Sequence, residues 1–327
     1  MRRRRLRGRL LVALVVILAG GAAAAIALVD GSDDGSGVKA AARAPRLQPI
    51  TKVRRRPDRR PARRPPPGIV MGGPNAVTVH LRPKPRAALL FDLDTGRVLW
   101  RLHPMRVLPI ASVTKIMTAL LVAERLPYNA TALIKKEAVR YTGSMVGVLP
   151  RGRRVPVSAL LYGMLLPSGN DAATALADRI SGSDRRFARL MNRRARQLRL
   201  SCTHYVSAYG LQEGNRSCPA DLAALTRLVM SKPRIAHVVR HEHVNIRFKY
   251  LKGKHLDLYS TNPLLRLGYP GTIGLKTGYT DPAGRCFVGV ARRDGHTLGA
   301  VLLNSADTGG NASRLLDAGF AELRGAG

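Results

Sequence analysis

The sequence predicts an α+β fold in which an antiparallel sheet, built from both ends of the folded part, is flanked by helices and carries an inserted helical subdomain. Short apolar runs typical of strands occur near residues 87–101 and again at 273–303. Between them, apolar residues recur at helical spacing. A doubly wound sheet would instead need strands and helices that alternate along the chain.

The N-terminus predicts export. Residues 1–9 contain six Arg, and Leu10–Val29 is an uncharged apolar run of 20 residues, long enough to span a bilayer. Arg on the near side places everything after Asp30 outside the cytoplasm, either anchored in the membrane or secreted to the wall. Small residues at 20–25 also suit cleavage, so residues 1–29 are a signal peptide or an N-terminal membrane anchor, and both remain open.

Residues 30–86 predict a disordered Arg/Pro-rich linker. They are rich in Gly, Asp, Pro and Arg and show almost no helical or strand periodicity. Proline and like-charge repulsion keep such a segment extended. The folded domain is therefore expected at residues 87–327.

The elements of that domain follow from local patterns. Two apolar runs separated by Asp94-Thr95-Gly96 predict a β-hairpin, and a second turn is expected at Asp294-Gly295. Pro127 ends the first helix. Helices are predicted at 112–126, 157–165, 171–180, 185–198 and 313–323, and strands at 87–91, 97–101, 273–279, 286–291 and 297–303.

The charge does not by itself indicate a nucleic-acid partner. The chain carries 55 Lys+Arg against 20 Asp+Glu, and the excess is spread along its whole length. Aromatic residues make up 5%, which argues against a stacking surface for single-stranded nucleic acid. We expect a solvated basic surface near anionic lipid or wall polymer, and no nucleic-acid binding.

The three cysteines fit an oxidising compartment. Cys202 and Cys218 flank a turn-rich segment, and a disulfide between them is expected. Cys286 lies in an apolar run and is expected to be a buried free thiol. The sequence has no C-x-x-C pair, and His241-Glu242-His243 lacks further ligands, so neither a metal site nor another cofactor is expected.

The first motif that carries chemistry is Ser112-Val113-Thr114-Lys115, at the start of a predicted helix. Residues three apart share a helix face, so an unprotonated Lys115 amine can take the proton of the Ser112 hydroxyl. The lysine needs a lowered pKa for this, through desolvation or nearby cations. Alone, the motif also fits a polar turn that begins a helix.

The second motif is Ser168-Gly169-Asn170, at a predicted turn between helices. The Ser168 hydroxyl could relay a proton to a leaving amine, and the Asn170 amide could hold a substrate carbonyl. Taken singly, the motif also fits an N-cap for the helix that begins near Asp171.

The third motif is Lys276-Thr277-Gly278 on a predicted strand. Lys276 and Thr277 could face an extended substrate, Gly278 permits close backbone approach, and an ammonium suits a terminal carboxylate. An exposed strand lysine is the simpler alternative for this motif alone. The three motifs together, in this order and on these elements, indicate one active site.

The three motifs match the signatures of penicillin-binding proteins and serine β-lactamases. Their surroundings, Ala111–Ala119, Leu165–Ala173 and Gly274–Thr280, resemble the low-molecular-weight D-alanyl-D-alanine carboxypeptidases. The resemblance spans about residues 87–323 and implies a DD-peptidase catalytic domain that acts on peptidoglycan stem peptides. It also implies that β-lactams acylate the same serine and that no cofactor is needed.

The resemblance also implies a role for each motif residue. Ser112 would attack the carbonyl between the two terminal D-alanines, with Lys115 as its base and Ser168 as the proton relay to the departing D-alanine. Asn170 would bind the substrate amide. Lys276 and Thr277 would engage the terminal carboxylate, with Gly278 beside them, and the backbone N–H groups of Ser112 and Tyr279 would form the oxyanion hole.

One departure from the family pattern concerns the substrate carboxylate. Family members often carry an Arg in the loop before the last helix, whereas residues 304–313 contain none and Arg314 is the nearest. Carboxylate recognition is therefore an open point of the sequence.

Other functions use related sites. A β-lactamase would need a second base, and no Glu-x-x-x-Asn element stands between Asn170 and Lys276. A DD-endopeptidase or transpeptidase shares all three motifs and stays open. A non-catalytic wall-binding protein is disfavoured because the motif residues are intact. Oligomeric state is not predicted.

Overall fold

The computed structural model describes residues 64–140, 143–248 and 255–325. The chain divides into two units at Arg59 and Arg60, and the described residues all belong to the second. The predicted export segment 1–29 and residues 30–63 of the predicted linker lie outside the described residues. Within the described part, no helix combines the length and the apolar character needed to cross a bilayer.

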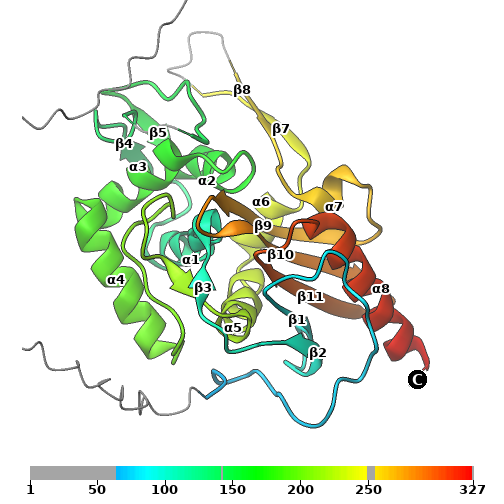
Figure 1. The fold of residues 1–327 in the computed structure, drawn as a ribbon. Helices are drawn as coiled ribbons and strands as arrows, with labels where there is room; N and C mark the ends of the chain where they lie inside the picture. Colours follow the sequence, from blue (N-terminus) through cyan, green and yellow to red (C-terminus); the bar gives the residue numbers. More distant parts are fainter. Residues whose placement is uncertain (1–63, 141–142, 249–254, 326–327) are drawn as a thin grey trace, which may run out of the picture. The chain divides into compact units, whose positions relative to one another are not determined.

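A five-stranded antiparallel sheet joins the two ends of the folded part (Figure 1). Its order is β2-β1-β11-β10-β9. β1 pairs with β11 so that Ala87 lies opposite Leu303. The strands are β1 (Ala87–Asp92), β2 (Val98–Leu102), β9 (Thr272–Thr280), β10 (Gly284–Arg293) and β11 (His296–Leu303). The predicted sheet from both chain ends, and with it the α+β fold, is confirmed.

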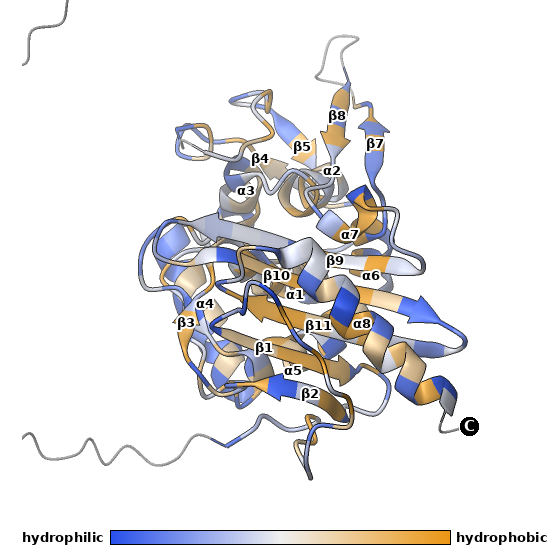
Figure 2. Cartoon of the chain, turned by 45° about the vertical axis from the view of Figure 1, so that its right-hand side comes forward, coloured by the Kyte–Doolittle hydropathy of each residue, from blue (hydrophilic) through white to orange (hydrophobic). Residues whose placement is uncertain are grey.

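Both faces of the sheet are covered, which explains the continuous apolar runs of its strands. Successive side chains of a strand point to opposite faces. Leu89 and Phe91 of β1 therefore pack in one core cluster, whereas Leu90 packs in another. Figure 2 shows hydrophobic residues along β1, β10 and β11. A strand buried on both faces lacks the alternation of a half-exposed one.

Helices form the two covering layers. α8 (Thr308–Gly325) covers one face through Leu315, Leu316 and Phe320. α1 (Lys115–Arg125) and α5 (Pro219–Met230) contribute to the core on the other face, with the rest of the helical subdomain beyond them (Figure 1). The remaining helices are η1 (Ala111–Thr114), α2 (Val157–Leu165), α3 (Asn170–Ser181), α4 (Asp184–Gln197), α6 (Pro233–Val239) and α7 (Pro263–Arg266).

Three small two-stranded sheets complete the described part, and the sequence patterns did not predict them. They pair β3 (Leu108–Pro109) with β6 (Arg216–Ser217), β4 (Thr131–Leu133) with β5 (Arg154–Pro156), and β7 (His243–Ile246) with β8 (Leu256–Tyr259). β3 ends just before η1, so its pairing with β6 helps to fix the start of the helical segment that carries Ser112 and Lys115.

Residues 64–86 pack against the domain, so the predicted linker boundary is wrong for them. Val70 makes backbone hydrogen bonds with Gly96 and Val98, at 2.9 and 3.0 Å. Val77 and Leu81 are buried in the core cluster beneath α8. This segment contains isolated apolar residues separated by prolines, and such a pattern has no helical or strand periodicity. Each apolar side chain can nevertheless pack against the domain, so the sequence pattern alone resembled a linker.

Candidate active site

The three motifs converge on one cavity of about 430 Å³. η1 carries Ser112, the turn before α3 carries Ser168, and β9 carries Thr277, although these elements are far apart in the sequence. The described residues that line the cavity are Ser112, Gly143, Ser144, Ser168, Asn170, Gly210, Leu211, Thr261, Thr277, Gly278, Tyr279, Thr280, Arg285, Cys286 and Thr308.

Lys115 connects the first two motifs. Its Nζ lies 2.7 Å from Ser112 Oγ and 2.8 Å from Asn170 Oδ1. The backbone carbonyl of Tyr209 lies 2.9 Å away, and Ser168 Oγ 3.5 Å away. The side chain is fully buried, so these four oxygen atoms replace the water that an exposed ammonium would have.

The environment of Lys115 favours the neutral amine. Burial lowers the pKa of Lys115 well below its usual value, and the nearby positive charge of Lys276 lowers it further, whereas Asp171 opposes both effects. A neutral amine 2.7 Å from a serine hydroxyl can accept its proton. The arrangement therefore has the chemistry of a nucleophile with its own general base.

Close backbone packing holds Ser112 in place. Ala111, just before it, has a φ of 46°, a left-handed conformation that non-glycine residues rarely adopt. Two other segments of the chain approach this turn so closely that each needs a glycine at the point of contact. A Cβ at Gly210 would lie 2.0 Å from Ala111 O, and one at Gly278 would lie 2.8 Å from Ser112 N. β9 thus approaches the Ser112 backbone because residue 278 has no side chain.

The Ser168-Gly169-Asn170 turn directs two side chains toward Lys115. Ser168 also has a left-handed backbone, with φ of 68°, and is 6% exposed. α3 begins at Asn170 without a side-chain cap at its N-cap residue, so the alternative interpretation of this motif as an N-cap is wrong. Strained conformations of this kind concentrate at functional sites.

Asp171 anchors the loop that covers this side of the cavity. Its buried carboxylate accepts hydrogen bonds from the backbone nitrogens of Val146 and Gly147, at 2.9 and 3.0 Å. The backbone nitrogen of Asn170 donates to Ser144 O at 2.8 Å. Ser144 is thereby held on the cavity wall, although no sequence motif marks it.

The residues of β9 in and just after the third motif differ in their burial and in their hydrogen bonds. Lys276 is 1% exposed, and burial lowers its pKa to about 7. Its Nζ donates to Thr277 O at 3.0 Å, so it is not an exposed strand lysine. Thr277 Oγ1 lies 2.6 Å from Thr261 Oγ1. Tyr279 is 62% exposed.

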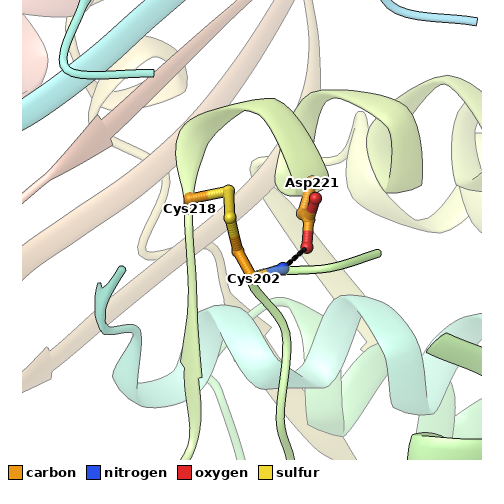
Figure 3. Close-up of side chains that lie close together, drawn as sticks. All are labelled: Cys202, Cys218 and Asp221. Carbon is orange, nitrogen blue, oxygen red and sulfur yellow. Dashed lines mark hydrogen bonds between the residues drawn. A yellow bond between two sulfur atoms is a disulfide. The ribbon is translucent and has the colours of Figure 1, made fainter. Parts of the chain in front are cut away.

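A disulfide closes the loop that brings Tyr209 and Gly210 to the site. Cys202 and Cys218 are bonded to each other, with their Cα atoms 5.6 Å apart (Figure 3). Asp221 accepts a hydrogen bond from Cys202 N at 2.7 Å. Because the two sulfurs are joined, this cluster offers no thiolate ligands for a metal ion. Cys286 is a buried free thiol, as predicted.

Sequence patterns missed several residues at the cavity. Tyr209 contributes a backbone carbonyl, and Ser144, Thr261 and Thr308 belong to no motif. Arg285 could have been found by continuing the register of the hairpin that follows the third motif, since it lies opposite Tyr279.

Fold and site together define a class of protein. A serine beside a buried lysine, at the meeting point of a helical subdomain and an antiparallel sheet, is the arrangement of the penicillin-binding acyl-transfer enzymes. Residues 76–307 match the sequence profile of the D-alanyl-D-alanine carboxypeptidases, peptidase family S11. The chain belongs to this family.

Curated relatives and a solved structure agree with this assignment. The D-alanyl-D-alanine carboxypeptidase DacB2 of Mycobacterium tuberculosis is 35% identical over 71% of this chain and 81% of its own. DacF of Bacillus subtilis is 32% identical over 75% of this chain, which spans 64% of that relative. The crystal structure of the DD-transpeptidase of Streptomyces K15 matches with a TM-score of 0.68 and 31% identity, covering 72% of this chain and 97% of that one.

Proposed function

We propose that the chain is a serine-type D-Ala-D-Ala carboxypeptidase that removes the terminal D-alanine from peptidoglycan stem peptides through an acyl-enzyme on Ser112. The observation that carries this proposal is the 2.7 Å contact between Ser112 Oγ and the buried Nζ of Lys115. Family membership supplies the substrate class.

In the acylation step, Ser112 Oγ attacks the carbonyl carbon between the two D-alanines while Lys115 Nζ takes its proton. The backbone N–H groups of Ser112 and Tyr279 stabilise the oxyanion, each such donor being worth about 3–4 kcal/mol of barrier. The close approach of β9 at Gly278 supports this pairing of donors. The Asn170 amide orients the substrate backbone.

The leaving group then needs a proton. Lys115 carries the one it took from Ser112, and the Ser168 hydroxyl, 3.5 Å from Lys115 Nζ, passes it to the departing amine as the C–N bond breaks. Water attacks the resulting ester and restores Ser112. Thr277 binds the end of the substrate that carries the terminal carboxylate.

The reaction belongs outside the cytoplasm, because the family acts on cell-wall peptidoglycan. The apolar run at residues 10–29 supports membrane anchoring or secretion through the N-terminal segment. β-Lactams, which carry a reactive carbonyl in place of the peptide bond, are the covalent inhibitors that this mechanism implies.

Penicillin labelling tests the proposal. We expect intact-mass and peptide-mapping measurements to find one covalent adduct, on Ser112, and a Ser112→Ala variant to lose both the adduct and D-alanine release from N-acyl-L-Lys-D-Ala-D-Ala. A folded protein without an adduct on Ser112 would contradict it. Steady nitrocefin hydrolysis faster than about one turnover per second would instead indicate a β-lactamase.

Transpeptidation is a second candidate, since the structural match from Streptomyces is described as a DD-transpeptidase. The two activities share the acyl-enzyme and differ only in the nucleophile that resolves it. Adding an amine acceptor such as glycylglycine to the D-alanine release assay separates them. A carboxypeptidase yields mainly the hydrolysed tetrapeptide analogue, whereas a transpeptidase yields mainly the acceptor adduct.

A further inference from the structure

The geometry points to Arg285 of β10 as the residue that binds the terminal carboxylate of the substrate, in place of an arginine from the loop before the last helix. This inference rests on the proposed function and adds a specificity-determining residue to it. It answers the question of carboxylate recognition that residues 304–313 leave open, because they contain no Arg.

Arg285 lines the cavity in which the substrate carboxylate must bind. It pairs opposite Tyr279 in the β9–β10 hairpin and lines the same cavity as Ser112 and Thr277. The carboxylate of a C-terminal residue follows the scissile carbonyl by one residue, a span of about 3.5 Å. The receptor must therefore share the cavity with the nucleophile.

The guanidinium is positioned but not neutralised. Arg285 is exposed, and its Nη1 donates to Ala306 O at 3.1 Å, which holds the group beside the start of α8. In the described part of the chain, no carboxylate lies within ion-pair distance of Arg285. An arginine keeps its charge at any physiological pH and matches a carboxylate with two parallel hydrogen bonds.

The two lysines near the nucleophile are less suitable receptors. Neither Lys115 nor Lys276 is among the described residues that line the cavity. Lys115 Nζ is surrounded by Ser112, Asn170 and Tyr209. Lys276 is 1% exposed, and with its pKa lowered to about 7 it is only partly charged near neutral pH.

Arg314 is occupied elsewhere. Its Nη1 contacts Asp307 Oδ2 at 3.4 Å and Asn311 Oδ1 at 3.1 Å, and it is not among the described lining residues. Thr308, from the segment that lacks the arginine, does line the cavity. The loop thus supplies the Thr308 hydroxyl, and β10 supplies the positive charge of Arg285. Arg314, which is not among the described lining residues, is a matched control for Arg285.

A pair of substrates tests this inference in the full-length protein. The substrates are N-acyl-L-Lys-D-Ala-D-Ala and its C-terminal amide, which has the same backbone but no carboxylate. We expect Arg285→Ala to lower kcat/KM for the free acid by roughly 10- to 150-fold, the range for a lost charged hydrogen bond. The amide should change much less, so the acid-to-amide preference falls. Arg285→Lys should restore part of that preference.

The outcomes are distinct. An equal loss on acid and amide, or an unchanged preference, would overturn the role of Arg285, as would a loss of preference in Arg314→Ala. Thermal unfolding of each variant identifies a folding defect, and for a variant that does not fold, Arg285→Gln provides the comparison. Wild-type protein that neither releases D-alanine nor forms a penicillin adduct would overturn the proposed function and this inference together.

Discussion

The cavity has two unlike sides. On the helical side, Lys115, Ser168 and Asn170 are nearly or fully buried, and the side chains of Ser168 and Asn170 lie within hydrogen-bonding distance of Lys115 Nζ. On the strand side, Tyr279 and Arg285 are exposed to solvent, whereas Lys276 is buried behind them. Burial shifts a pKa because it removes water from the charged form, whereas exposure leaves a charge intact. The difference indicates that one side is suited to proton transfer and the other to recognition of a charged substrate.

The largest expected effect comes from removing the amine of the helical side. Lys115→Arg keeps a cation but cannot act as a base, and Lys115→Met fills similar space without an amine. We expect either change to slow penicillin acylation about 10³-fold, within the range for a lost general base. Stopped-flow or mass-resolved acylation rates measure this.

Lys136→Arg is the matched control, since Lys136 is exposed. It should acylate like the wild type. A loss of less than about tenfold in both Lys115 variants, with normal unfolding temperatures, would show that proton transfer does not depend on Lys115. The two sides of the cavity would then not differ in chemical role.

The second effect concerns the contact between β9 and η1, where the strand side of the cavity meets the helical side. In Gly278→Ala, the new methyl group would lie 2.8 Å from Ser112 N and 2.9 Å from Val113 N, so β9 or η1 must shift. A displacement of this kind near reacting atoms can cost about 100-fold in rate, and we expect that loss in acylation. Gly72→Ala, which has open space around the new Cβ, should have no effect on the rate. Equal rates in both variants would mean that this contact does not position Ser112.

The third effect is on stability and concerns Lys276, the buried residue of the strand side. Its pKa falls from 10.5 to about 7 on folding. Between these values the unfolded chain binds more protons than the folded one, so this residue makes the free energy of unfolding rise with pH and adds nothing to the slope well below pH 7. From pH 7 to 9 the rise amounts to about 2 kcal/mol.

Urea unfolding at pH 7, 8 and 9 checks this sign. In Lys276→Met the rise should be smaller than in the wild type by that amount, whereas Lys136→Met, at an exposed position, should follow the wild-type slope. Parallel curves for Lys276→Met and wild type would mean that Lys276 titrates normally. Burial on the strand side would then not change the protonation of its lysine.

Much of the fold could be predicted, because it depends on local periodicity. The predicted helix at 157–165 coincides with α2, and the strands of the central sheet were placed within a few residues. α5 was missed because it is buried around most of its circumference, from Ala220 to Val229, and so lacks a single apolar stripe. Strands of two or three residues, such as β3, are too short to show a period.

The same distinction between local patterns and non-local packing applies to the residues of the site. The three motifs are local patterns, so they could be identified from the sequence. Tyr209 acts through a main-chain carbonyl, which no side-chain pattern reveals, and Thr261 reaches the cavity only because its chain segment crosses beside β9. The buried state of Lys276 also depends on packing from distant segments, so its strand position alone did not separate a surface lysine from a buried one.

The smallest expected effect is that of Thr261, whose hydroxyl lies 2.6 Å from Thr277 Oγ1. Thr261→Val keeps the shape and removes this hydrogen bond together with the one that Thr261 Oγ1 donates to Leu166 O at 3.2 Å. Loss of the contact with Thr277 should cost about 1 kcal/mol, or roughly fivefold in kcat/KM for the free-acid peptide. Since we propose that Thr277 binds the carboxylate end of the substrate, the loss should come mostly through KM, with penicillin acylation at saturating concentration little changed. Thr78→Val, at an exposed position, is the control. A loss confined to kcat would assign Thr277 to the chemical step and so remove the boundary between the two sides.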